Sequence, residues 1–372
     1  MSSRHLDALV IGAGVIGTAV AFELAEAGAK VRLLEAGSPG AGASRASAGV
    51  LAPYLEGHDN PVLRELGRRS LDMYDGFVQR VTAKAGLPVE FDRRGTLEIA
   101  VSDEDEARLT ASHAALAKEK IGAKWLDAKA VAKLEPHVRG DVRGGLLNPL
   151  HAAVNVPALT AAQAAAAVKA GVKLTTGMAA ATLIEENRLA VVQTAEGIWR
   201  ADHIVVANGT SAPGLTVSGS DPLPVRPVRG QLLQLKAAQD SIKHVLWAPG
   251  VYLVPWRDGT VLVGATSEHV GFDDRATAEG VAGLIAAATG LVPKLAGATF
   301  QHAKSGLRPG SPDELPFIGR SDVVKNVIFA TGHYRNGALL APLTATLVTR
   351  LAQGDSSDPA LKALDPQRVG RL

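Results

Sequence analysis

Residues 6–35, LDALVIGAGVIGTAVAFELAEAGAKVRLLE, decide the fold of this chain. An apolar run stops at Gly12, and Gly12, Gly14 and Gly17 follow one another in G-x-G-x-x-G spacing. Apolar residues then recur at helical intervals, and a second apolar run ends in Glu35. This order predicts a strand, a glycine-rich turn, a helix and a second strand.

Each part of this βαβ unit has a physical role in binding a dinucleotide. Gly12 permits the tight turn, Gly14 lets the backbone approach a pyrophosphate, and Gly17 lets the helix pack against the strand. The helix N-terminus presents free N–H groups to the phosphates, and the Glu35 carboxylate accepts hydrogen bonds from a ribose diol. The alternative is a glycine-rich turn that binds nothing. Because strand, helix and acid are all in place, we predict a dinucleotide site.

The segment after Glu35 favours FAD over NAD. Residues 36–53, AGSPGAGASRASAGVLAP, form a long run of Gly, Ala and Ser with one Arg. Small residues let backbone amides close around a large ligand, and FAD is longer than NAD, with its flavin threaded past this segment. The alternative is a flexible surface loop, but Ala48, Val50 and Leu51 are too apolar for a solvated linker.

Composition limits the remaining possibilities. The 372 residues are 47% hydrophobic, which suffices for about two domains with their own cores. A formal net charge of +2 indicates neither a nucleic-acid partner nor an anionic membrane surface. The absence of cysteine excludes disulfides, thiolate catalysis and a cysteinyl–flavin bond, and it suits a reducing, cytoplasmic compartment. We expect no metal site, no signal peptide and no integral membrane segment.

Periodicity along the chain predicts alternating helices and strands. Helices are predicted over 61–85, 103–118, 156–170 and 281–291, with a short helical connection over 125–138. Strands are predicted over 90–101, 172–198, 203–209, 223–235, 252–255 and 260–265. The chain ends in a second βα unit, with a strand over 326–332, a loop over 333–337 and a helix to about residue 352.

Nucleotide-binding elements therefore occur at both ends of the chain, and we expect another around Asn208. The predicted fold is α/β, or α+β when the whole chain is counted, in the form of a two-domain flavoprotein. A Rossmann-like FAD-binding domain is built from the discontinuous segments 1–85, 140–215 and 305–372. An antiparallel-sheet substrate domain is built from 86–139 and 216–304.

Three polar side chains in the last third follow predicted strands. Arg308 is flanked by Leu and Pro, and a buried guanidinium needs a partner, which a small carboxylate substrate would supply bidentately. The alternative is a structural pair with Asp313 or Glu314. Tyr252 can share the carboxylate or be an ordinary half-buried strand tyrosine. Arg335 contacts substrate or flavin, or caps its loop.

The helix after Gly337 has a further use. Its N-terminus carries a positive dipole end and free amides, which would stabilise the anionic pyrimidine ring of a reduced flavin. The alternative is an ordinary C-terminal βα unit that completes the sheet.

The motifs resemble those of glycine oxidases of the D-amino acid oxidase superfamily, the ThiO type associated with thiamine biosynthesis. The resemblance extends from about residue 6 to residue 350. It is carried by VIGAGVIG (10–17), SAGVLAP (47–53), PVRGQLL (227–233), VGATSE (263–268), GLRPG (306–310) and GHYRNGALLAP (332–342).

This resemblance implies FAD as the cofactor and gives a set of residues that would contact it. They are Gly12, Gly14, Val15, Ile16, Gly17, Glu35, Ala43, Ser44, Ala48, Gly49, Val50, Ala180, His333, Tyr334, Arg335, Asn336, Gly337, Ala338 and Leu339. It places Arg308 and Tyr252 on the substrate carboxylate, with Arg335 close by. Lys304 departs from a commonly aromatic position and Ala338 from a larger aliphatic one, so both alter the pocket size or dioxygen access.

The implied reaction is oxidation of glycine, small amines or small D-amino acids to the imine, which yields a 2-oxo acid and ammonia. Two electrons pass to the flavin and then to dioxygen, which leaves as hydrogen peroxide. No side-chain base is expected, because His333 is in the flavin loop and His244 is on an exposed-looking stretch. A homo-oligomer is expected, although the residues do not set its size.

Four alternatives remain open. A D-amino acid dehydrogenase would pass the electrons to a quinone, and a sarcosine or N-methyl amino acid oxidase would use non-covalent FAD. An NAD-dependent dehydrogenase would bind a different dinucleotide. A nucleotide-binding subunit would have no chemistry of its own.

Overall fold

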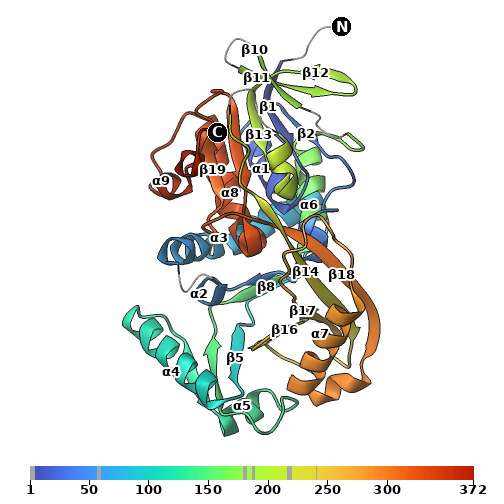
Figure 1. Ribbon diagram of the computed structural model, residues 1–372, viewed down its shortest axis with the longest axis vertical. Helices are drawn as coiled ribbons and strands as arrows, with labels where there is room; N and C mark the ends of the chain where they lie inside the picture. The colour runs from blue at the N-terminus through green and yellow to red at the C-terminus, as the bar shows by residue number, and fades with distance from the viewer. Residues whose placement is uncertain (1–4, 57–59, 179–181, 187–188, 216–219, 240) are drawn as a thin grey trace.

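Two large sheets occupy opposite ends of the molecule (Figure 1). The computed structural model describes residues 5–56, 60–178, 182–186, 189–215, 220–239 and 241–372. A six-stranded sheet lies in the upper half of the view and an eight-stranded sheet in the lower half. The α/β class expected from the sequence is confirmed.

The six-stranded sheet is parallel except at one edge, and its order is β19-β20-β13-β1-β2-β9. Its strands are β1 (Leu6–Ile11), β2 (Val31–Leu34), β9 (Lys173–Thr175), β13 (Ala201–Val206), β19 (Phe317–Arg320) and β20 (Val327–Thr331). Ala8 and Val10 of β1 join the helix-side core, whereas Leu9 and Ile11 join the core on the opposite face. Because both faces are covered, these strands read as continuous apolar runs.

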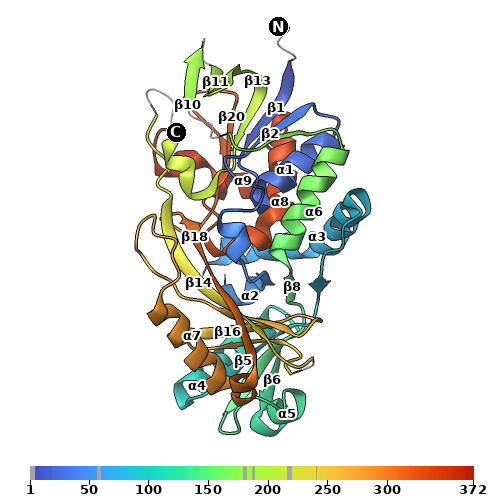
Figure 2. The same ribbon diagram turned by 90° about the vertical axis from the view of Figure 1, so that its right-hand side faces the viewer.

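Helices cover one face of this sheet and a small meander covers the other. Figure 2 shows α1 (Val15–Glu26) beside α6 (Val156–Lys169) and α8 (Gly337–Ala352), which it contacts directly. The long helix α3 (Pro61–Ala85) packs on α6 and α8. The opposite face is covered by the antiparallel strands β10 (Thr182–Glu186), β11 (Leu189–Thr194) and β12 (Gly197–Trp199).

The eight-stranded sheet has the order β18-β14-β17-β16-β15-β5-β7-β6 and is antiparallel except between β15 and β5. Its strands are β5 (Thr96–Ala100), β6 (Lys124–Asp127), β7 (Gly144–Asn148), β14 (Arg226–Lys236), β15 (Val245–Ala248), β16 (Val251–Pro255), β17 (Thr260–Gly264) and β18 (Thr299–Gly310). Leu253 and Val263 pack against the helix α7 (Ala278–Leu291). Tyr252 and Leu262 alternate with them, so they lie on the opposite, inner face.

Short elements join the two sheets. The strands β3 (Val50–Leu51), β4 (Phe91–Asp92) and β8 (Ala152–Val154) form a small sheet between them. The remaining helices are α2 (Pro53–Glu56), α4 (Asp103–Lys118), α5 (Ala128–Leu134) and α9 (Ala360–Leu364). None of the helices in the described ranges combines the length and the apolar character needed to cross a membrane.

Helix boundaries followed the local signals closely. The predictions for 61–85 and 103–118 are confirmed, with Asn60 and Ser102 as N-caps that accept hydrogen bonds from backbone N–H groups of the first turn. The helical connection predicted over 125–138 is wrong at its start. There, Trp125 and Leu126 belong to β6 and pair with Leu146 and Gly145 of β7, and the helix begins only at Ala128.

The proposed division into two domains stays a prediction. Strand pairing adds one relevant fact. β7 lies inside the segment 140–215 expected in the FAD-binding domain, and it pairs with β5 and β6 of the eight-stranded sheet.

Candidate active site

A cavity of about 610 Å³ lies between the two sheets. Its lining includes Ile11, Leu34, Ala207 and Ala330, which stand at or next to the carboxyl ends of β1, β2, β13 and β20. The inner face of the eight-stranded sheet lines the other side. Ligands of open α/β sheets bind outside the carboxyl ends of the strands, and this volume is within the ~300–1,000 Å³ typical of cofactor sites.

The glycine motif is packed so tightly that side chains are excluded. Gly12 has a φ of 100°, and a Cβ there would lie 2.7 Å from the Ala207 carbonyl oxygen. A Cβ at Gly17 would lie 1.8 Å from the Gly12 carbonyl oxygen. Gly14 immediately precedes α1, and the Val15 N–H donates to the Ser44 hydroxyl at 3.0 Å. Gly14, Val15 and Ile16 line the cavity, so the start of α1 faces it, as phosphate binding requires.

Two acceptors fit the polar parts of a dinucleotide. The Glu35 carboxylate accepts from Ala13 N–H at 2.7 Å and from Gly37 N–H at 2.9 Å, which holds it at the end of β2. Each of its oxygens keeps lone-pair capacity for a ribose hydroxyl. The side-chain oxygen of Asn208 is buried without a partner in the described chain, and Asn208 lines the cavity. The residues present therefore fit FAD.

Glu35→Ala is expected to weaken FAD binding while the fold persists. A hydrogen bond to a charged acceptor contributes about 1.5–3 kcal/mol, so the loss of even one corresponds to an increase in Kd of about tenfold or more. Flavin fluorescence during titration of apoprotein measures this Kd, with Glu35→Gln as a control that keeps one acceptor oxygen. An unchanged Kd for Glu35→Ala would remove Glu35 from the ribose.

The opposite side of the cavity carries the polar residues from β15, β16 and β18. Arg308 donates from NH1 to the Thr266 carbonyl at 3.0 Å, and it forms no ion pair within the described ranges. Asp313, the alternative partner, instead pairs with Arg368, whose Nε lies 2.8 Å from a carboxylate oxygen. The Arg308 guanidinium thus faces the cavity without an acidic partner from the described residues.

Aromatic stacking shapes the same wall. The Tyr252 ring stacks on Trp247, with centroids 4.8 Å apart and an interplanar angle of 28°. Both residues line the cavity. Arg335 is exposed at the edge, where its NH2 group lies 3.4 Å from the Ser267 hydroxyl and its guanidinium lies over the Tyr334 ring.

Neither histidine considered for catalysis is placed as a general base. His333 is buried, its Nε2 lies 3.0 Å from the Thr344 hydroxyl, and desolvation lowers its pKa to about 3. His244 is partly buried, not exposed, and its Nδ1 bonds the Glu135 carboxylate at 2.7 Å.

Most of the residues expected at the cofactor line the cavity. They are Gly12, Gly14, Val15, Ile16, Glu35, Ala43, Ser44, Ala48, Gly49, Val50, His333, Tyr334, Arg335, Gly337 and Ala338. Gly17, Asn336 and Leu339 are instead packed behind the lining. Ala180 lies outside the described residues.

The sequence analysis missed several lining residues. Trp247, Thr266 and Ser267 reach the cavity because β15, β16 and β17 pair side by side, which no local motif signals. Thr210 and Ser211 follow Asn208 and Gly209, which line the cavity with them. The polar residues that follow the buried strand β13 were the sequence signal that could have identified Thr210 and Ser211.

Lys304 faces a side pocket of about 140 Å³ that shares Ser47 and Val156 with the main cavity. It is half-buried, and desolvation lowers its pKa. Ala338 is buried in the wall of the main cavity. Both departures from the glycine oxidase pattern thus lie next to the cofactor space.

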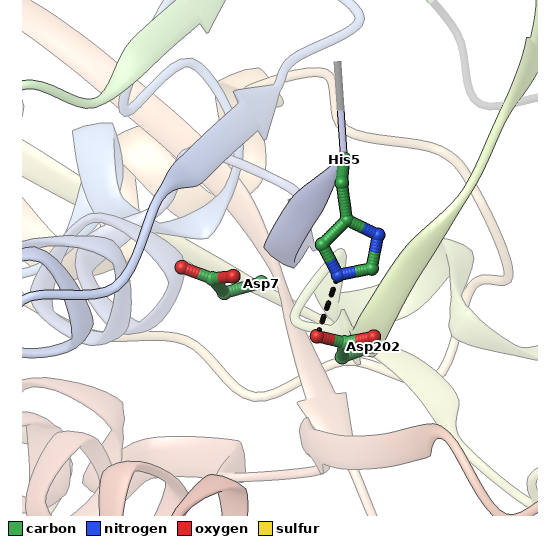
Figure 3. Close-up of side chains that lie close together, drawn as sticks. All are labelled: His5, Asp7 and Asp202. Carbon is green, nitrogen blue, oxygen red and sulfur yellow. Dashed lines mark hydrogen bonds and ion pairs between the residues drawn. The ribbon is translucent and has the colours of Figure 1, made fainter. Parts of the chain in front are cut away.

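One cluster of potential metal ligands lies far from this cavity. His5, Asp7 and Asp202 group at the amino-terminal ends of β1 and β13, whereas the cavity is at the carboxyl ends. His5 Nε2 lies 2.9 Å from Asp202 Oδ2, and Figure 3 shows that Asp7 takes no part in this contact. Asp7 accepts instead from the Lys30 N–H. Exposed pairs of this kind contribute little to stability.

The fold and the cavity define a dinucleotide-binding α/β protein whose binding cavity lies at the carboxyl ends of parallel strands. Comparison with known proteins identifies the dinucleotide. The family described as FAD dependent oxidoreductase matches residues 7–351, and the chain belongs to this family. FAD is its cofactor, as the sequence predicted.

Individual relatives agree with the predicted resemblance to glycine oxidases, which is confirmed. The chain is similar to the glycine oxidase of Pseudomonas putida, with 33% identity over 98% of each chain. The crystal structure of glycine oxidase from Geobacillus kaustophilus superposes with a TM-score of 0.94 at 30% identity, covering 98% of this chain and 99% of that one. The bifunctional protein ThiO/ThiG of Trichormus variabilis is 36% identical over 95% of this chain. The chain spans about half the length of that relative, 54%.

Proposed function

We propose that the protein oxidises glycine and other small amines or D-amino acids, with FAD as electron acceptor and dioxygen as the final oxidant. The observation that carries this proposal is the Arg308 guanidinium, which faces the cofactor cavity with no acidic partner in the described chain. A small carboxylate supplies that partner, because guanidinium and carboxylate match in charge and in bidentate geometry.

The cofactor and the side chains have different roles in the proposed reaction. FAD supplies the two-electron chemistry. Arg308 and Tyr252 hold the substrate carboxylate and so direct the α-carbon hydrogen toward the cofactor. Such positioning alone contributes several kcal/mol to lowering a barrier. The substrate's own deprotonated amine replaces a side-chain base, in keeping with the buried, neutral His333.

The product imine hydrolyses to a 2-oxo acid and ammonia. Supply of an imine to thiamine thiazole biosynthesis follows as a proposed role, supported by the ThiO/ThiG relatives. Cytoplasmic location and homo-oligomeric assembly are part of the same proposal. The absence of cysteine from the sequence supports the location.

Anaerobic cofactor reduction tests the substrate class. Glycine is expected to bleach the flavin absorbance of the holoprotein, and methylamine, a small amine without the carboxylate that Arg308 anchors, is expected to bleach it far more slowly. Sarcosine and D-alanine in the same assay rank the substrates. Equal reduction by methylamine and glycine would show that no carboxylate anchor operates, and the proposal would fail.

A further inference from the structure

Arg308 lies flat against the backbone of β14. A Cβ at Gly230 would lie 2.2 Å from its NH2 atom, so only glycine leaves room for the guanidinium there. Its NH1 atom donates to the Thr266 carbonyl at 3.0 Å and lies 3.4 Å from the Arg229 carbonyl. We call Arg229, Gly230 and Thr266 the arginine cradle. The cradle holds one edge of the guanidinium and leaves the rest for a ligand.

Thr266 follows the end of β17 and is tied to β14 by several bonds. Its N–H donates to the Gln231 carbonyl at 3.2 Å, and the Gln231 N–H donates back to the Thr266 hydroxyl at 2.9 Å. That hydroxyl in turn donates to Glu268 Oε1 at 2.5 Å. Glu268 therefore positions Thr266 through its hydroxyl, and the carbonyl of Thr266 is the one that aligns Arg308.

Glu268 joins both halves of the cradle. Its Oε1 atom also accepts from Gln231 Nε2 at 2.7 Å, and its Oε2 atom accepts from Arg229 NH2 at 2.5 Å. Arg229 is only 4% exposed, and its backbone pairs with that of Glu268 in both directions. The hydrogen bond from Arg229 lowers the pKa of Glu268 to about 2, so its carboxylate is ionised at neutral pH.

We propose that Glu268 is a positioning residue for the substrate carboxylate, because it sets the two carbonyls that align Arg308. It does not touch the substrate in this account, and its effect is transmitted through Thr266 and Arg229. The inference rests on the proposed function, in which Arg308 binds that carboxylate.

The chain offers a matched control in Asp273. Its carboxylate also pairs with Arg229, with 3.0 Å between an oxygen and NH1. Within the described ranges it accepts no hydrogen bond from Thr266 or Gln231; its other partner is Arg275. Glu268→Gln and Asp273→Asn each leave Arg229 one carboxylate, but only the first disturbs the cradle.

Replacement of Glu268 by Gln cannot satisfy both sides of the cradle. An amide oxygen placed toward Thr266 and Gln231 turns the NH2 group toward the Arg229 guanidinium. The opposite orientation faces that NH2 group with the Gln231 amide donor and the Thr266 hydroxyl. Either arrangement brings donor against donor beside the buried Arg229 and Gln231 side chains, which is costly.

The experiment compares the two variants as holoproteins. Glu268→Gln is expected to raise the KM for glycine about tenfold with kcat changed less than about twofold, because carboxylate binding loses alignment. The Kd for acetate, a carboxylate without an amine, is expected to rise by a similar factor when followed by flavin difference absorbance. Asp273→Asn is expected to leave both constants within about twofold of the parent.

Thermal unfolding and FAD content of both variants separate positioning from general damage. Equal losses of Tm with a selective rise in the Glu268→Gln constants support the proposal. Parental KM and acetate Kd in Glu268→Gln, or equal rises in both variants, would overturn it. A parent protein that binds acetate but oxidises no glycine would instead overturn the proposed function, while the acetate comparison would still decide the role of Glu268.

Discussion

Arg308→Ala is expected to lower kcat/KM for glycine by about 10²–10³-fold, because truncating one partner of a desolvated charge pair costs about 2–5 kcal/mol. In the structure the Arg308 guanidinium lies against Gly230 and donates to the Thr266 carbonyl, and no other cationic side chain of the described residues makes these contacts. Steady-state kinetics at several glycine concentrations, together with acetate binding, measure the loss.

Two further variants test whether the loss of activity is specific to the Arg308 guanidinium. Arg308→Lys is expected to be almost as poor, since an ammonium is a point charge that cannot form the bidentate pair. Arg335→Ala is expected to have the smaller effect, because Arg335 is exposed at the cavity edge. Near-parental efficiency in Arg308→Ala, with a large loss in Arg335→Ala, would move the carboxylate to Arg335.

Gly17→Ala is expected to abolish FAD retention and to lower the stability of the chain strongly. The added Cβ would lie 1.8 Å from the Gly12 carbonyl oxygen, and this neighbour is backbone at the phosphate turn, so it cannot rotate away. Overpacking of a core already costs about 1–3 kcal/mol when side chains can adjust. FAD content after purification and the Tm report the two effects.

Gly76→Ala is the matched control for this substitution. Gly76 also lies inside a helix, α3, but a Cβ there meets no atom within 4 Å. Alanine is favoured over glycine in a helix interior by about 0.5–1 kcal/mol, so Gly76→Ala is expected to keep its FAD and to gain slightly in stability. Full FAD content in Gly17→Ala would contradict the close packing of the turn.

Local signals explain why much of the fold was predictable. The Gly12–Gly17 turn, the Asn60 cap of α3 and the Ser102 cap of α4 each depend on residues within a few positions of one another. Their geometry can therefore be predicted from short stretches of sequence. The cofactor side of the cavity follows from these stretches, because parallel strands deliver their carboxyl ends to one edge.

The substrate side depends on contacts that no short stretch contains. Arg229 and Glu268 are 39 positions apart and meet only because β14 pairs with β17 and β18. β6 was misassigned for the same reason, since its strand character comes from pairing with β7. Antiparallel register is a property of the whole sheet, so these residues had to be seen in three dimensions.

The most direct test of the account is a pair of assays on one preparation of holoprotein with glycine as substrate. One assay follows hydrogen peroxide in air, and the other follows an artificial quinone or dye without air. The account predicts peroxide in amounts that match the ammonia released, with slower dye reduction. Rapid dye reduction with negligible peroxide would make the protein a dehydrogenase, and no turnover of glycine in either assay would contradict the proposed substrate as well.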